Sequence, residues 1–551
     1  DRVIDLVYNN YMFLNDAALD VNPLLLSFLS AAAGGYIVHL IYVQRITTRS
    51  ILDRLFATFC FYVKRLPIIR GLIQESMDTA DQSIKVMIHK NDSSRDWLTT
   101  LPAGPMSRQD ILLRSVQYDN RENSGLYARE KPDFLNGRVS GAVFNLEQDL
   151  EELRTYKGLF GQYAFSNPLW PQCFPGLRRM EAEVTKMVIT MLNGGPECSG
   201  TMTAGGSMSI HQAILAYRNR AIKKGILFPE IILPSSAHIA FFKAAEMFGL
   251  AIRQIAVPED TFVVRPADVK AAINSNTACI VGSAPNYPFG TVDPIEELGQ
   301  IGLKYDVPLH VDACCGGFLI PFFADEQVPF DFRVPGVSSI SADTHKYGLA
   351  PKGSSVIAFA SKELRRFTYF TGANWQGGIY ASPTIEGSRN GSAIAVTWGA
   401  MLYHGEDAYK NSAEAVRATT RAIREGIRGM EGMQLMGEGD ICIVAWRNSI
   451  VDDYALSELM ERRGFVLSPL QFPKGCHLMV TPMHTKGDFV GTFLAAMEKA
   501  IADLKKNPKS VTGGTCAFYG GTVNLPDRDI VKDLASIYLD NVYEFPPETS
   551  R

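Results

Sequence analysis

The chain has 551 residues, of which 46% are hydrophobic and 20% are charged, a balance typical of a globular protein with two or three domains. Its formal net charge of −4 gives no reason to expect a nucleic-acid-binding surface. The nine cysteines lack the paired spacing of a zinc site, so we expect reduced, buried thiols and no metal.

The first predicted element is a transmembrane helix at residues 23–43. This stretch contains no Asp, Glu, Lys or Arg, and about 20 residues of helix span the roughly 30 Å of bilayer hydrocarbon. A signal peptide and a buried core helix are the alternatives, but the stretch is long for a signal peptide and no basic segment precedes it. Basic residues follow it, at Arg45, Arg49, Arg54, Lys64, Arg65 and Arg70. The positive-inside rule then places residues 1–22 in a lumen and the rest of the chain in the cytosol.

Two further segments precede the main domain. Residues 44–100 are predicted to form a juxtamembrane helix and a linker. The apolar, basic-flanked stretch 55–73 either lies on the cytoplasmic membrane face or packs on the body of the protein. Residues 101–180 are predicted to form an N-terminal subdomain that includes a turn region at 137–144.

From residue 181 to residue 400, helical and strand patterns alternate. Predicted strands lie at 230–234, 251–255 and 279–283. This alternation is typical of a doubly wound, mostly parallel sheet that binds ligands at the carboxyl ends of its strands. After it, residues 401–551 show a long amphipathic helix and strands near 441–444 and 477–480, which predicts a smaller α/β domain.

A phosphate site is predicted at Gly205, Gly206 and Ser207. These small residues precede a helical pattern with Ile210 and Ile214 on one face. The free N–H groups and the dipole of a helix start favour an anion. Alternatively, Ser207 is a plain N-cap that needs no ligand.

A buried carboxylate is predicted at Asp312, at the end of the apolar strand 307–312. Burying a carboxylate is costly unless a cation meets it, and the pyridine nitrogen of pyridoxal phosphate (PLP) is such a partner. The alternative is an Asp that caps the following turn.

A Schiff-base lysine is predicted at Lys346, in a polar turn after the short strand 338–342. A lysine at such a strand end projects into a cleft, where partial desolvation lowers its pKa and frees the amine. The alternative is a solvated surface lysine. The phosphate site, the carboxylate and the lysine follow one another along the chain in the order expected for successive strands of one α/β sheet. Together they predict a PLP site.

These residues carry a resemblance to a known family. The chain resembles the sphingosine-1-phosphate lyases, which are fold-type-I PLP enzymes related to the group II decarboxylases. The resemblance extends from the apolar segment to about Tyr519. It rests on residues 166–169, 174–178, 310–313, 341–348, 351–355 and 375–383. The His-Lys pair and the strand-end Asp are shared with the decarboxylases, whereas the runs at 351–355 and 375–378 are typical of the lyases.

The resemblance implies a carbon–carbon lyase of sphingolipid degradation, anchored by one helix in the endoplasmic reticulum membrane. It would cleave the C2–C3 bond of a phosphorylated sphingoid base to a long-chain aldehyde and phosphoethanolamine. It also implies a homodimer with shared active sites, in which residues 375–380 reach the neighbouring site.

The predicted site residues follow. Lys346, Asp312 and His238 form the catalytic set, with His238 stacked on the pyridine ring. The cofactor-binding set comprises Lys346, Gly205, Gly206, Ser207, His238, Asp312, His345, Gly377 and Gly378. His345 either contacts the cofactor phosphate, orients the lysine or is an ordinary buried histidine.

Lys352 is the candidate for binding the substrate phosphate, because it is a second cation close to Lys346 without an obvious partner in its own segment. The alternative is again a solvated surface lysine.

Three residues depart from the family pattern. Phe144 stands where a Tyr is common, Trp170 where a His is common and Met208 where a Glu is common. Backbone N–H groups form the phosphate site, so cofactor binding is expected to survive. The base for the C3 hydroxyl stays open, with Tyr519 as one candidate.

Two other functions are compatible with these motifs. A PLP-dependent amino acid decarboxylase shares the strand-end Asp and the His-Lys pair but requires neither an anchor nor Lys352. A cofactor-binding but weakly active membrane-tethered paralogue is the other, suggested by the changes at Phe144 and Trp170.

Overall fold

The structure is a computed structural model that describes residues 62–88, 104–120, 137–145, 150–324, 328–508 and 528–544, with a few isolated residues between these ranges. The predicted segment 1–22 and the predicted transmembrane helix at 23–43 lie outside the described residues. Among the helices that are described, none is both long and apolar enough to cross a membrane.

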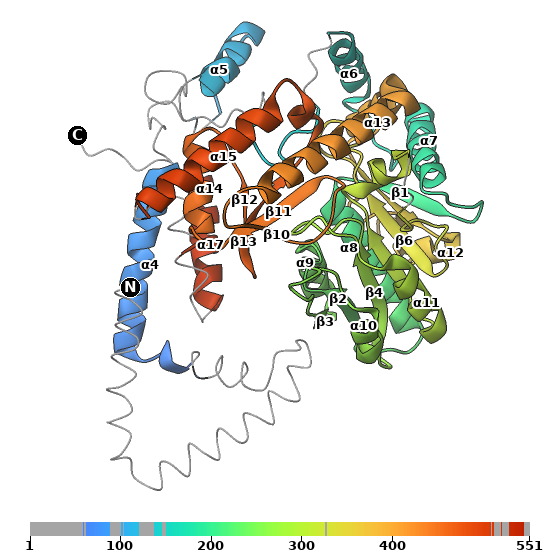
Figure 1. Ribbon diagram of the computed structural model, residues 1–551. Coiled ribbons are helices and arrows are strands. Elements are labelled where there is room, and N and C mark those ends of the chain that lie inside the picture. The colour runs from blue at the N-terminus through green and yellow to red at the C-terminus, as the bar shows by residue number, and fades with distance from the viewer. Residues whose placement is uncertain are drawn as a thin grey trace.

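A seven-stranded sheet forms the centre of the large domain (Figure 1). In spatial order its strands are β1 (Ser199–Thr203), β7 (Ser355–Phe359), β6 (Val337–Ala342), β5 (Leu309–Asp312), β4 (Thr277–Ser283), β2 (Glu230–Pro234) and β3 (Ala251–Ile255). The strands from β6 to β3 pair in parallel, while β7 is antiparallel to both of its neighbours. The predicted mostly parallel sheet is confirmed, and β1, β2, β4, β5 and β6 all end at the same edge.

Helices cover both faces of this sheet, because both faces of its strands are apolar. They are α7 (Pro175–Met191), α8 (Gly206–Lys223), α9 (Ala240–Phe248), α10 (Pro266–Ala272), α11 (Ile295–Tyr305) and α12 (Lys362–Arg366), with 3-10 turns η6 (Gly316–Phe318) and η7 (Ile320–Phe322). Ile231 and Val281 pack with α8 and α9. Their neighbours Ile232 and Ile280 pack on the opposite face with α7 and α11.

The smaller C-terminal domain has an antiparallel sheet of four strands (Figure 1). In spatial order these are β10 (Met433–Leu435), β11 (Ile443–Asn448), β13 (Lys474–Met479) and β12 (Ser468–Gln471), and the domain also contains α14 (Asp453–Arg462), η8 (Pro482–Thr485) and α15 (Phe489–Lys506). Val139 forms a parallel bridge with Val466, so the turn region predicted at 137–144 lies on this domain.

One long helix, α13 (Gly391–Arg428), runs from the large domain to the small one. It is interrupted at Gly405, where φ is 64° and ψ is 179°. The predicted boundary after residue 400 lies inside this helix, and the one after residue 180 lies inside α7. The two domains are therefore joined by this kinked helix rather than by an irregular linker.

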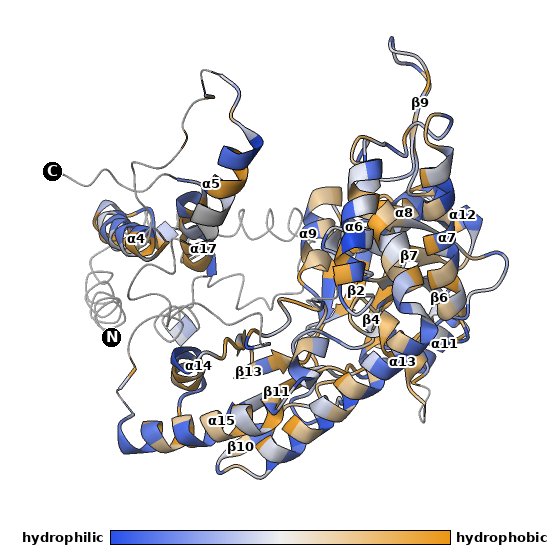
Figure 2. Cartoon of the chain, turned by 90° about the horizontal axis from the view of Figure 1, so that it is seen from above, coloured by the Kyte–Doolittle hydropathy of each residue, from blue (hydrophilic) through white to orange (hydrophobic). Residues whose placement is uncertain are grey.

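The remaining helices lie at the periphery: α4 (Pro67–Ile88), α5 (Arg108–Asn120), α6 (Leu150–Tyr163) and α17 (Arg528–Tyr543). Helices α4 and α17 lie side by side in both views (Figures 1 and 2), and Asp81 accepts a hydrogen bond from Asn541 at 2.6 Å. Residues 67–73 of the predicted apolar stretch belong to α4. A hairpin of β8 (Phe370–Gly372) and β9 (Tyr380–Ser382) projects from the large domain (Figure 2).

Candidate active site

The carboxyl edge of the central sheet gathers the residues of the predicted site. The chain leaves β5 at Asp312, and it leaves β6 into the turn that carries Lys346. β1 leads into the start of α8 at Gly206, and β2 leads into the loop that carries His238. Parallel strands present their following loops at one edge, which is where α/β sheets bind ligands.

Lys346 is half-buried in this edge, with 21% of its side chain exposed. Its Nζ lies 3.1 Å from Asp343 Oδ2 and 3.5 Å from Cys315 Sγ. Burial by itself lowers the pKa of the Lys346 ammonium, but the neighbouring Cys315 and Asp343 outweigh burial and raise the pKa well above its ordinary value. Asp343 Oδ2 is the carboxylate oxygen that pairs with Nζ, and burial raises the pKa of the Cys315 thiol. This direction is the opposite of the expected lowering of the lysine pKa, because that expectation considered burial and not the neighbouring Cys315 and Asp343.

Asp312 is buried, with 7% of its surface exposed. Its Oδ1 accepts hydrogen bonds from the Cys314 N–H at 3.1 Å and from the Ser341 hydroxyl at 3.2 Å. Burial raises its pKa, but His238 and the Cys314 hydrogen bond more than offset this, so the pKa of Asp312 is lowered and it stays ionised. It forms no ion pair with Lys or Arg among the described residues, so a buried negative charge faces the site without a permanent cation.

The start of α8 provides the predicted phosphate site. Gly205 has a φ of 151°, which glycine adopts easily, and no side chain caps the helix. A Cβ on Gly206 would lie 2.6 Å from Asp343 Oδ2 and 2.9 Å from Cys314 Sγ, so only glycine lets the three segments approach. Ser207 is exposed. The Met208 and Ser209 N–H groups bond the Gly205 carbonyl, at 2.9 and 3.0 Å, which leaves the Gly206 and Ser207 N–H groups for an anion.

The two predicted histidines both use Nδ1 as a hydrogen-bond acceptor and so carry a hydrogen on Nε2. His345 Nδ1 accepts from the Ser354 N–H, and His238 Nδ1 accepts from the Ala240 N–H, both at 3.2 Å. Burial lowers the pKa of each imidazole. Each Nε2–H is therefore a donor, and that of His345 lies 3.6 Å from Asp343 Oδ2.

Lys352 lies at the mouth of the site, where its residue surface is exposed. Its Nζ stands 4.7 Å from the centre of the Phe144 ring, a cation–π contact. Partial burial, followed by repulsion from Lys346, lowers the pKa of Lys352. The ring of Phe144 in turn meets Tyr347 edge-on at 5.0 Å.

Gly377 and Gly378 are not brought to this edge. They lie exposed in the tip of the β8–β9 hairpin, beside Trp375 and Ile379, which are 62% and 89% exposed. Trp170 is also exposed, at 59%. These residues therefore do not join Lys346 within one chain.

Sequence reasoning missed two residues of the site. Asp343 precedes Lys346 by three positions in the same turn, a spacing that could have identified it as the ion-pair partner. Tyr287 follows β4 and packs its ring edge-on against His238 at 5.9 Å. The loop before it gave no signal, since its position depends on the tertiary fold.

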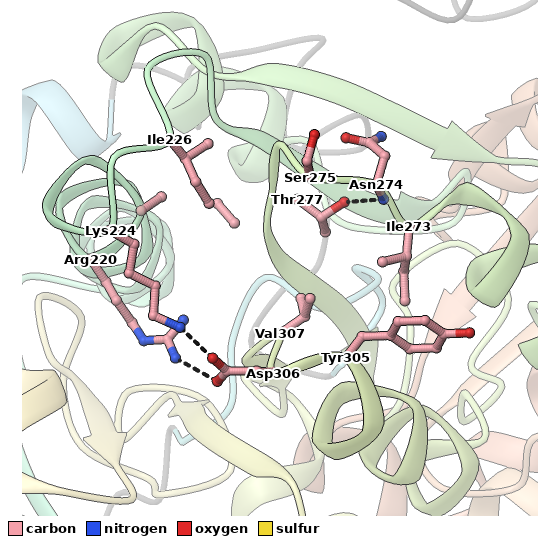
Figure 3. Close-up of a pocket in the computed structure, with 12 residues that line it drawn as sticks. Arg220, Lys224, Ile226, Ile273, Asn274, Ser275, Thr277, Tyr305, Asp306 and Val307 are labelled. Atoms are coloured by element: carbon pink, nitrogen blue, oxygen red, sulfur yellow. Dashed lines mark hydrogen bonds and ion pairs between the residues drawn. The ribbon is translucent and has the colours of Figure 1, made fainter.

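A separate pocket of about 340 Å³ lies at the opposite, amino edge of the sheet (Figure 3). Arg220 and Lys224 both bind Asp306 there, at 2.9 and 2.5 Å. Helices α8 and α11 end at this point, so the two cations neutralise adjacent negative helix ends. None of the predicted site residues lines this pocket. Among the described residues, no group of His, Cys, Asp and Glu could hold a metal ion.

The residues at the carboxyl edge fit PLP. Open helix N–H groups suit its phosphate, an uncompensated buried carboxylate suits its protonated ring nitrogen, and a lysine lies between them. Asp343 Oδ1 is also buried without a hydrogen-bond donor among the described residues, which marks the site as polar beyond the needs of the fold.

The comparisons with known proteins agree with this site. The pyridoxal-dependent decarboxylase conserved domain matches residues 166–449. Sphingosine-1-phosphate lyase 1 of Mus musculus is 39% identical over 88% of this chain and 84% of its own length. The sphingosine-1-phosphate lyase of Arabidopsis thaliana is 40% identical over 88% of each chain.

Solved structures of a lyase and of a decarboxylase have folds similar to that of this chain. A sphingosine-1-phosphate lyase of Burkholderia pseudomallei superposes with a TM-score of 0.69 at 34% identity, covering 74% of this chain and 94% of its own. A glutamate decarboxylase of Lactobacillus brevis shares the fold, with a TM-score of 0.63 at 19% identity over 76% of this chain and 98% of its own. The chain therefore belongs to the sphingosine-1-phosphate lyase family, built on the fold of the pyridoxal-dependent decarboxylases.

Proposed function

We propose that the protein is a PLP-dependent lyase that cleaves the C2–C3 bond of phosphorylated sphingoid bases, such as sphingosine 1-phosphate. The products are a long-chain aldehyde and phosphoethanolamine. Identities of 39–40% to named lyases over 88% of the chain support this assignment. The observation that carries it is the convergence of Lys346, Asp312 and the open start of α8 at one sheet edge.

Each group of this edge has a role toward the cofactor. Lys346 attaches it, the N–H groups of Gly206 and Ser207 bind its phosphate, and ionised Asp312 keeps its ring nitrogen protonated. When bound, PLP withdraws the electron pair that C2 retains after the C2–C3 bond breaks. His238, which packs edge-on against Tyr287, would cover one face of the ring.

The chain's own groups move the protons. The reaction removes a proton from the C3 hydroxyl, which becomes the aldehyde oxygen, and adds a proton at C2. Lys346 Nζ lies 3.1 Å from Asp343 Oδ2, and as an ammonium group it could deliver the proton to C2. Phe144 cannot accept a proton from the hydroxyl, and Trp170 lies exposed outside this edge. The base therefore comes from another group, for which Tyr519 remains a candidate.

Lys352 supplies the recognition of the substrate phosphate. Its Nζ is held over the Phe144 ring and close enough to Lys346 for the two charges to repel each other. A doubly charged phosphate at the site mouth relieves this repulsion. The cation–π contact holds the ammonium against the Phe144 ring, 4.7 Å from its centre.

The decarboxylase alternative has weaker support. The glutamate decarboxylase similarity is at 19% identity and shows the fold alone. Incubation with a phosphorylated sphingoid base and, separately, with acidic and aromatic amino acids tests the choice. Release of long-chain aldehyde supports the lyase, and release of carbon dioxide overturns it.

Replacing Lys346 tests the attachment of the cofactor. We expect Lys346→Ala to lose the near-visible absorption band of the attached cofactor, and we expect aldehyde release to fall by at least about a thousandfold. Absorption spectra and an aldehyde assay on both proteins provide the measurement. Lys362→Ala, at an exposed lysine of α12, is the control and should change neither. A variant at Lys346 that keeps the band would refute the assignment.

Replacing Lys352 separates phosphate recognition from chemistry. Loss of a charge-assisted hydrogen bond of about 2 kcal/mol should raise KM for the phosphorylated base roughly thirtyfold in Lys352→Ala. The absorption band should stay, and Lys352→Arg should recover part of the affinity. Steady-state kinetics with both variants give the answer; an unchanged KM in Lys352→Ala would contradict the role.

We also propose that the protein is anchored in the endoplasmic reticulum membrane by the apolar residues 23–43, with its catalytic domain in the cytosol. The support is the length of that stretch and the basic residues after it. The full chain should remain in the membrane pellet after a carbonate wash of microsomes, whereas a chain without residues 1–43 should appear in the supernatant. Retention of the shortened chain in the pellet would argue against a single anchor.

We further propose a homodimer in which the β8–β9 hairpin contacts the partner's site. The support is the exposure of Trp375, Ile379 and Phe370 on a projecting hairpin, because exposed aromatic clusters favour burial in an interface (Figure 2). Trp375→Ser combined with Ile379→Ser should shift the protein toward monomer in analytical ultracentrifugation. Leu227→Ser, at a 71% exposed leucine elsewhere, is the matched control. An unchanged dimer in the double variant would exclude the hairpin as the main contact.

A further inference from the structure

A buried carboxylate lies outside the predicted site, on helix α6. Glu152 is 2% exposed, and its Oε1 accepts hydrogen bonds from Asn145 Nδ2 at 2.7 Å and from the Tyr156 hydroxyl at 2.6 Å. The same oxygen lies 3.2 Å from His404 Nε2 on α13. Its other oxygen, Oε2, is buried without a hydrogen-bond donor among the described residues. A fold that needed only packing here would be better served by an apolar residue, because an incompletely bonded buried carboxylate is destabilising.

The hydrogen-bond partners of Glu152 also contact the turn at residues 343–350, which carries Lys346 and is called the lysine turn below. Asn145 Nδ2, besides binding Glu152, donates to the Leu349 carbonyl at 3.1 Å. Next to it, the Tyr409 hydroxyl of α13 donates to the Gly348 carbonyl at 2.9 Å. Leu349 itself has a φ of 59°, a left-handed conformation that is unfavourable for a leucine. Two side chains from outside the turn thus hold the consecutive carbonyls of a strained backbone, two and three residues after Lys346.

The same contacts fix the neighbourhood of Lys352. Phe144 precedes Asn145 directly, is 3% exposed and forms the surface on which the Lys352 ammonium lies. Its ring also packs against Tyr347 in the lysine turn. A displacement of Asn145 would therefore move both the turn that carries Lys346 and the ring that carries Lys352.

We propose that Glu152 is a positioning residue which, through Asn145, holds the lysine turn and Phe144 in one geometry and so sets the separation of the two lysines. This inference rests on the proposed function for the roles of Lys346 and Lys352. Glu152 touches neither cofactor nor substrate. Its partner His404 lies on α13, one residue before the interruption at Gly405. Glu152 is therefore also connected to the helix that joins the two domains.

Hydrogen exchange measured by mass spectrometry on residues 344–352 tests the inference without requiring turnover. The Leu349 and Ala350 N–H groups are bonded inside the turn, to the carbonyls of Lys346 and Thr344, both at 3.1 Å. They therefore exchange only when the turn opens. We expect Asn145→Ala to accelerate exchange of this peptide about fivefold, the factor that corresponds to one lost neutral hydrogen bond. Tyr156→Phe is the matched control, because it removes another hydrogen bond to the same oxygen without a contact to the turn, and it should leave this peptide within about twofold of the parent.

Variants of Glu152 give a second, independent readout. Glu152→Gln keeps an acceptor at Oε1 and should preserve both the exchange rate and KM, whereas Glu152→Leu should behave like Asn145→Ala. In the variants that loosen the turn, kcat/KM for the phosphorylated base should fall about tenfold or more, with KM raised, since a displacement of about 1 Å in a site costs up to a hundredfold. If Asn145→Ala does not fold, the comparison of Glu152→Gln with Glu152→Leu carries the test.

Two results would overturn the inference. One is equal acceleration of exchange at 344–352 in Asn145→Ala and Tyr156→Phe, which would show general destabilisation. The other is unchanged exchange in Glu152→Leu. A failure of the proposed function would look different, because the parent protein would then release no aldehyde while the exchange pattern would be unaffected.

Discussion

A lysine half-buried among carboxylates is the constraint on which the active-site edge depends. The Lys346 ammonium is partly removed from water in the turn after β6, and its ion pair with Asp343, at 3.1 Å, offsets the cost of that desolvation. Asp343, in turn, lies against the first turn of α8, whose positive end stabilises its charge. The arrangement requires glycine at position 206, since a single methyl group there would overlap both carboxylate oxygens. The phosphate site and the lysine site are therefore one packing unit, and neither can change without the other.

Much of this could be predicted from the sequence because it depends on local pattern. Apolar strands followed by Asp312 and by Lys346 predicted a parallel sheet with a site at its carboxyl edge, and both the sheet and the family are confirmed. The family resemblance at residues 310–313 and 341–348 supplied the chemistry that periodicity alone left open. What it could not supply was the balance of charges around Lys346, because the pKa of a buried amine depends on distances to groups that only the fold brings together.

Other features escaped prediction for different physical reasons. The domain boundaries after residues 180 and 400 were placed where patterns change, but α7 and α13 continue through these points. A change of pattern inside a continuous helix gives no linker signal, and α13 packs on both domains. Gly377 and Gly378 were assigned from motif alone, and a motif does not show that these residues lie in a hairpin that projects from the large domain. Tyr287 reaches His238 only through the turn after β4, which no local pattern encodes.

Phe144, which stands where the family commonly has a Tyr, has a structural role through its contacts. A phenyl ring cannot transfer a proton, yet here it carries the Lys352 ammonium on its face and meets Tyr347 with its edge. Its backbone neighbour Asn145 is fixed by Glu152, a charged group that a simple hydrophobic core would not contain. The segment 137–145, which lies on the small domain through the Val139–Val466 bridge, therefore contributes order to a site whose chemical groups all belong to the large domain. The small domain meets the surroundings of Lys346 through this segment and through Tyr347, whose hydroxyl donates to the Val480 carbonyl at 2.6 Å. A motion of that domain relative to the central sheet would therefore change the spacing of Lys346 and Lys352.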